Sequence, residues 1–197
     1  MEEKEALDEL LFIKKVISDS KKIIADNGLS YIVWGILVDI GMIGAYLNYK
    51  YQFTVNYIYV WILLIALGWF FALFYYKLRK KETHVETFAG KIMGALWFAA
   101  GISMSVAGLI GFFSGSISGD AIAPVVASIL GAPYFISSLL NGQTWFKILA
   151  LLWWTGAAVM FFTGGFTSVI IMIFLMTFGQ IVPGIILYIN AKKQCCD

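Results

Sequence analysis

The chain has 197 residues, of which 60% are hydrophobic, 17% are aromatic and only 13% carry a charge. A soluble domain needs one apolar face per element, whereas whole windows of this chain carry almost no charge. The composition therefore excludes a soluble globular protein and is typical of an integral membrane protein. Phosphate-binding and nucleic-acid-binding motifs are absent, and the net charge of +2 needs no such partner to explain it.

The first 28 residues form a charged segment with the periodicity of an amphipathic helix. Its apolar stripe includes Leu10, Ile13, Ile17 and Ile24, and its polar face carries two pairs of lysines one heptad apart. This pattern favours a helix on the cytoplasmic face of the membrane, and it also suits docking of a cytoplasmic protein or a second protomer. The lysines of this surface are Lys14, Lys15, Lys21 and Lys22. No cleavage site follows an apolar stretch here, so we expect no removable signal peptide.

Six windows of about 18 to 26 residues follow, each long enough to cross a hydrocarbon core of ~30 Å. Their connections are short, so successive spans are expected to be antiparallel neighbours. We therefore predict an all-α integral membrane protein, a bundle of six transmembrane helices in three hairpins over residues 29–190, followed by a tail at 191–197. The predicted spans are 29–49, 57–77, 88–113, 122–140, 145–162 and 166–189.

The distribution of lysine and arginine predicts the orientation of these spans. Of the 14 Lys and Arg residues, all except Lys50 fall in the N-terminal segment, near the second and fourth connections or after the last span. Short basic loops stay on the cytoplasmic side of the membrane. Both termini are therefore expected to be cytoplasmic.

A faint internal repeat runs through the spans. "WGILVDIG", "GALWFAAG" and "LALLWWTG" each place a small residue six positions before a glycine, and the even-numbered spans carry Gly68, Gly131 and Gly179 at similar depth. These matches indicate a weak threefold repeat of the hairpin. Close packing of helices through small residues also explains the same glycines.

Asp39 is a single charge about halfway along the first predicted span. An ionised carboxylate there costs about 2.5 to 3.5 kcal/mol on insertion scales, so the side chain is expected to face protein or water. Gly35, one turn earlier, leaves space beside it. No cationic residue is expected at this depth. Asp39 is therefore expected either to be protonated or to face a water-filled cavity.

Polar residues of other spans lie at a depth similar to that of Asp39. They predict a midplane site for a ligand or ion, because intramembrane ionisable groups are commonly functional. The simpler alternative is a neutral acid that hydrogen-bonds a neighbouring helix. The candidate site consists of Asp39, Ser103, Thr155, Thr177 and Gln180, with Ser105 as a further neighbour.

Two prolines, Pro133 and Pro183, predict irregularities in the fourth and sixth spans. Each lacks an amide proton and so frees the carbonyl four residues earlier, at Ile129 and Gly179. Broken helices with such carbonyls line the sites of many transporters. Membrane helices also tolerate proline as a simple kink, which is the interpretation we favour.

Signals for an enzyme are poor. The single histidine, His84, lies in a charged loop, so neither a histidine metal site nor a serine–histidine dyad is expected within the membrane. Cys195 and Cys196 are expected to be reduced thiols in a cytoplasmic tail. We therefore expect no catalytic residue, no metal and no cofactor.

The order of features resembles that of small uncharacterised multipass proteins of the bacterial inner membrane. The resemblance lies in the first fifty residues, in "ALDELLFIKKVISDS" followed by "GLSYIVWGILVDIG". It implies the same membrane location and carries over no activity.

Two functions are consistent with these patterns. The first is binding or transport of a small solute or ion at a polar site around Asp39, alone or as the membrane subunit of a larger complex. The second is a non-catalytic regulatory or scaffolding role in which the N-terminal helix recruits a cytoplasmic partner. Asp39 and the two proline-bearing spans together favour the first.

Overall fold

The computed structural model of the chain describes residue 11 and residues 28–53, 56–82 and 88–194. All regular structure in these ranges is helical, and six stretches are long and apolar enough to cross a membrane. The predicted N-terminal helix with its four lysines lies outside the described residues except for Leu11 and Gly28, as do His84, Cys195 and Cys196. The helices are α2 (Gly28–Tyr51), α3 (Ile58–Glu82), α4 (Phe88–Ser105), η1 (Val106–Gly111), α5 (Gly119–Asn141), α6 (Trp145–Thr163), α7 (Gly165–Met176), η2 (Thr177–Ile181) and α8 (Val182–Gln194), where η marks a π-helix.

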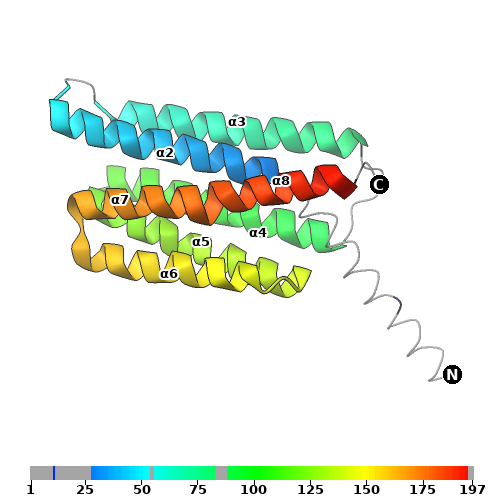
Figure 1. Ribbon diagram of the computed structural model, residues 1–197. Helices are drawn as coiled ribbons and strands as arrows, with labels where there is room; N and C mark the ends of the chain where they lie inside the picture. Colours follow the sequence, from blue (N-terminus) through cyan, green and yellow to red (C-terminus); the bar gives the residue numbers. More distant parts are fainter. Residues whose placement is uncertain (1–10, 12–27, 54–55, 83–87, 195–197) are drawn as a thin grey trace.

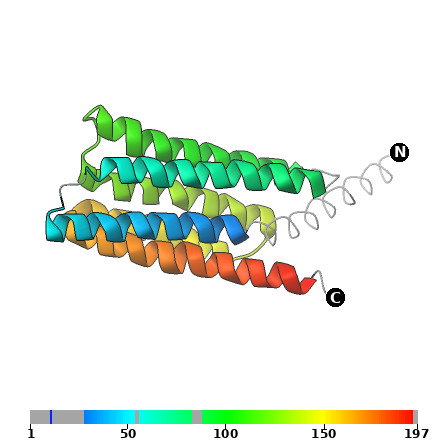
Figure 2. The same ribbon diagram turned by 90° about the horizontal axis from the view of Figure 1, so that it is seen from above.

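The helices lie side by side in one bundle with roughly aligned axes (Figures 1 and 2). Helix α2 packs against α3 and also against α7, η2 and α8, so the first and last apolar stretches are neighbours. Helix α5 packs most extensively against α6 and also contacts α4 and α7. Because α3 and α4 have the fewest buried residues, they form the outer part of the bundle.

The core lies between α5, α6 and α7. Its largest fully buried side chains include Trp153, Tyr134, Phe146, Met160 and Met172. The outward faces of the long helices instead expose leucine, isoleucine and phenylalanine over their whole length. A soluble monomer rarely exposes so much contiguous apolar surface, so this exterior is compatible with a multipass membrane protein.

Tryptophan rings fill the notches that glycines leave in neighbouring helices. The pairs are Trp34 with Gly68, Trp61 with Gly41, Trp69 with Gly101 and Trp154 with Gly131. In every pair an added Cβ would lie no more than 3.1 Å from the ring, which is closer than ordinary van der Waals contact. These glycines therefore serve close helix packing, as their residue type in an apolar helix suggests.

The closest approach of two backbones joins the start of α2 to α8. A Cβ at Gly28 would lie 2.5 Å from the carbonyl oxygen of Gly184 and 2.6 Å from the amide nitrogen of Tyr188. A Cβ at Gly184 would in turn lie 2.9 Å from the carbonyl oxygen of Gly28. Only two glycines allow the helices to come this close.

Pro133 and Pro183, the two prolines expected to mark irregularities, have different surroundings. Helix α5 continues past Pro133, whose carbonyl oxygen accepts a hydrogen bond from Ser137 Oγ at 2.6 Å. Pro183 is instead the second residue of α8, two positions after the end of η2. A second π-helix, η1, occurs in the third apolar stretch without any proline, and the sequence analysis did not predict it.

Candidate functional site

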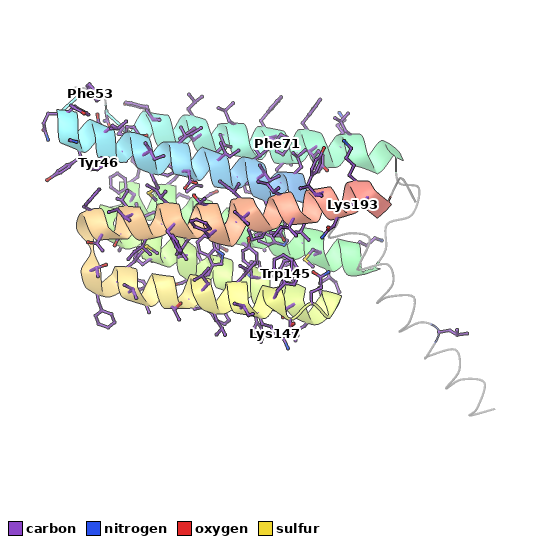
Figure 3. The ribbon with its side chains drawn as sticks, in the orientation of Figure 1. Tyr46, Phe53, Phe71, Trp145, Lys147 and Lys193 are labelled. Carbon is purple, nitrogen blue, oxygen red and sulfur yellow. The ribbon has the colours of Figure 1, made fainter. Side chains whose placement is uncertain are left out.

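One face of α2 follows the last apolar stretch along its length. Gly35 lies against Ile181, and the ring of Tyr46 stacks on Phe166 with 4.7 Å between ring centroids, near the end marked by Tyr46 in Figure 3. Asp39 lies between these two contacts, one turn beyond Gly35. The helix register therefore directs Asp39 toward η2.

Asp39 meets Thr177, the first residue of η2. Thr177 Oγ1 donates a hydrogen bond to Asp39 Oδ2 at 3.0 Å. The hydroxyls of Thr155 and Thr163 donate instead to carbonyl oxygens one turn back on their own helix, which is the usual arrangement for threonine within a helix. Thr177 thus gives its only proton to the carboxyl group of another helix.

The second carboxyl oxygen has no such partner. Asp39 Oδ1 is buried and accepts no hydrogen bond from the described residues. The hydrogen bond from Thr177 is the one shown to the carboxyl group within the described ranges, and α7 and η2, which lie against this part of α2, contain no lysine or arginine. A buried oxygen without a partner is costly, so this position is suited to an additional atom that the described residues do not supply.

The backbone beside Asp39 is irregular. In η2 the amide of Val182 donates to the carbonyl oxygen of Thr177, five residues back instead of four. The next residue is Pro183, which has no amide proton to donate to a carbonyl of the preceding turn. The freed carbonyl expected at Gly179 stays a prediction.

Gln180 extends the polar face of η2 into the core. Its Oε1 accepts a hydrogen bond at 2.9 Å from the hydroxyl of Tyr134, a fully buried residue of α5. The Tyr134 ring lies among aromatic side chains of α2, α4 and α6, including Trp153 at 6.3 Å between centroids. One π-helix therefore carries two polar contacts, Thr177 to α2 and Gln180 to α5.

The Tyr134–Gln180 bond is expected to show strong coupling in a double-mutant cycle. Gln180→Leu alone leaves the buried tyrosine hydroxyl unpaired, and Tyr134→Phe alone leaves the amide oxygen unpaired, each at a cost of about 1 to 3 kcal/mol. The double variant loses both groups and should cost less than the sum of the single variants. Denaturation of purified protein in detergent measures the three free energies of unfolding, and strictly additive values would contradict the contact.

Ser103 and Thr155 stand apart from this site. Both are exposed, and their hydroxyls donate to Ala99 and Leu151 of their own helices. Ser105 accepts a hydrogen bond at 3.1 Å from Trp69 Nε1 and serves the contact between α3 and α4. The structure therefore brings together Asp39 and Thr177, with Gln180 on the same turn, and leaves the serines and Thr155 elsewhere.

Sequence reasoning missed the aromatic side of the site. Tyr134 and Trp153 are ordinary residues in a chain with 17% aromatic content, so their type alone singles out neither of them. The π-helix η2 had a partial signal in Pro183, which lies two residues after its end. Within the described ranges, no group of three His, Cys, Asp or Glu residues is placed to hold a metal ion.

Comparison of the chain with models of protein families, with curated proteins and with solved structures finds no match.

Proposed function

We propose that this chain is a bacterial inner-membrane protein that binds or transports a small solute or ion, alone or as the membrane subunit of a larger complex. The observation that carries the proposal is the buried Oδ1 of Asp39, in the middle of an apolar helix, which has no hydrogen-bond partner among the described residues. A passive anchor gains nothing from a carboxyl group there, whereas binding sites commonly hold one. The adjacent π-helix supports the proposal, since such irregular turns recur at functional sites.

The proposed orientation has both termini in the cytoplasm and three antiparallel hairpins in the bilayer. Lys147 and Lys193 lie at one end of the bundle, and Phe53 lies at the other (Figure 3). Lys77, Lys91 and Lys192 belong to the same lysine-bearing set by their place in the chain. Exposed aromatic residues such as Tyr49 and Tyr59 suit the opposite membrane interface.

Native mass spectrometry on gently extracted protein tests the proposed site. A small-molecule adduct on the wild type is expected to disappear in Asp39→Asn and to fall about tenfold or more in Thr177→Val, because the first change removes the carboxyl group and the second removes the hydroxyl that hydrogen-bonds it. The matched control is Thr155→Val, the same chemical change at an exposed threonine that bonds its own helix.

The proposal fails if Thr155→Val and Thr177→Val reduce the adduct equally, or if Asp39→Asn retains it at the wild-type level. Folding of each variant is checked by its thermal unfolding in detergent, so that loss of the adduct is not loss of the protein.

A further inference from the structure

The charged and titratable groups around Asp39 define which species can bind there. Helix α7 and the π-helix η2 both pack against α2, and neither contains a titratable side chain. On α8 the nearest is Tyr188, which lies against Gly28, about 16 Å along α2 from Asp39 at 1.5 Å per residue. Lys192 and Lys193 are farther along the same helix.

On the side of α2 that faces α3, the titratable residue in contact with α2 is Tyr57, which directly precedes α3. Its hydroxyl donates to the carbonyl oxygen of Gly41 at 2.8 Å. Gly41 is two residues from Asp39 and so lies on nearly the opposite side of the helix. Tyr59 and Lys77 of α3 belong to the helix ends. Asp39 therefore lacks a fixed counter-charge among the described residues and must be neutralised by something mobile.

This position has too few oxygen ligands for a metal ion. Ions that leave water in the membrane interior need several oxygen ligands, commonly six or more for Ca²⁺ and Mg²⁺. Here two side chains contribute, and the proton of Thr177 Oγ1 already points at Asp39 Oδ2. A divalent ion would also leave a net positive charge beside a single carboxylate in apolar surroundings.

A proton makes a smaller demand on the surroundings. It needs one lone pair of one oxygen, here the buried Oδ1 that has no partner among the described residues, and it removes the cost of burying an ionised carboxylate. The hydrogen bond from Thr177 then falls on Oδ2, which is the carbonyl oxygen of a neutral acid. This arrangement gives the two carboxyl oxygens different roles, one protonated and one accepting.

We infer that the Asp39–Thr177 site binds a proton and exchanges it with water, so that the ion handled by the site is H⁺ and not a metal cation. The inference rests on the proposed function, since it names the ion of that same site.

Labelling with dicyclohexylcarbodiimide in vesicles tests it. A neutral carboxyl transfers its proton to a nitrogen of the reagent while its oxygen adds to the central carbon, and the adduct rearranges to a stable N-acylurea that retains the whole reagent. The reagent dissolves in lipid, and Ile36, Ile40 and Ile43 beside Asp39 are all exposed on α2. Peptide mapping by mass spectrometry locates the label, and Asp120, exposed in the first turn of α5, is the internal control.

The expected result is labelling of Asp39 well above that of Asp120, with a fall of about tenfold per pH unit once the carboxyl ionises. Labelling at one pH should be the same in sodium, potassium and choline chloride. Protection by sodium or potassium but not by choline would overturn the proton assignment while leaving an ion site in place.

Infrared spectroscopy makes a negative labelling result decisive. The band of a neutral carboxyl group should be present in the wild type and absent in Asp39→Asn. If neither the label nor this band is found, Asp39 is not protonated and the inference is wrong. If both are found while the adduct of the mass-spectrometry experiment does not depend on Asp39, the proton site stands and the solute-binding function fails.

Discussion

Gly28→Ala is expected to lower the free energy of unfolding by about 1 to 3 kcal/mol, the usual cost of overpacking. The added methyl group would lie 2.5 Å from a carbonyl oxygen and 2.6 Å from an amide nitrogen of α8. Both atoms belong to the backbone, so no side chain can rotate away and the helices must separate. Because α2 also positions Asp39, the separation should weaken the contact with Thr177 as well. Thermal unfolding in detergent measures the first effect.

The matched control is Gly94→Ala in α4. Nothing lies within 4 Å of a Cβ at Gly94, and alanine favours helix by about 1 kcal/mol relative to glycine. This variant should therefore be as stable as the wild type or slightly more so. Equal destabilisation by the two changes would mean that α2 and α8 do not meet through Gly28.

Trp153→Ala should be the most destabilising single change in the bundle, at about 3 to 5 kcal/mol. The indole is fully buried, packs beside Tyr134 and lies 3.3 Å from the position of a Cβ on Gly179. Its removal leaves a cavity between α5, α6 and η2. We expect a large fall in the midpoint of thermal unfolding and a weaker Tyr134–Gln180 contact.

Phe162→Ala provides the comparison on the same helix. Phe162 is 92% exposed, so loss of its ring creates no cavity and should change the free energy of unfolding by no more than about 0.5 kcal/mol in detergent. A loss of stability similar to that of Trp153→Ala would contradict the burial pattern of α6.

Position along the helix axes was the predictable part of this structure. Counting residues along apolar runs places Asp39 near the middle of α2, and Thr177 and Gln180 at a comparable depth on the last stretch. Direction around each helix axis was not predictable. Ser103 and Thr155 were grouped with Asp39 by depth, yet both are exposed and bond their own helices.

The reason is the uniform polarity of these helices. In a soluble helix, polar residues mark the outer face and thereby fix the rotation of the helix. Here apolar side chains both fill the core and cover the exterior, so isoleucine and phenylalanine occur on every side and give no such mark. Glycine positions indicate the contact face of α2 better than polar residues do, since Gly35 and Gly28 lie on the face that meets η2 and α8.

The pairing of the first apolar helix with the last has a consequence for biosynthesis. Asp39 and Thr177 are 138 positions apart. At 5 to 20 residues per second, a ribosome needs roughly 7 to 28 s to add the threonine after the aspartate. Throughout that interval α2 exists without the helices that cover it in the finished protein. The nascent chain must therefore keep a carboxyl group in an apolar helix without its hydroxyl partner until Thr177 has been added.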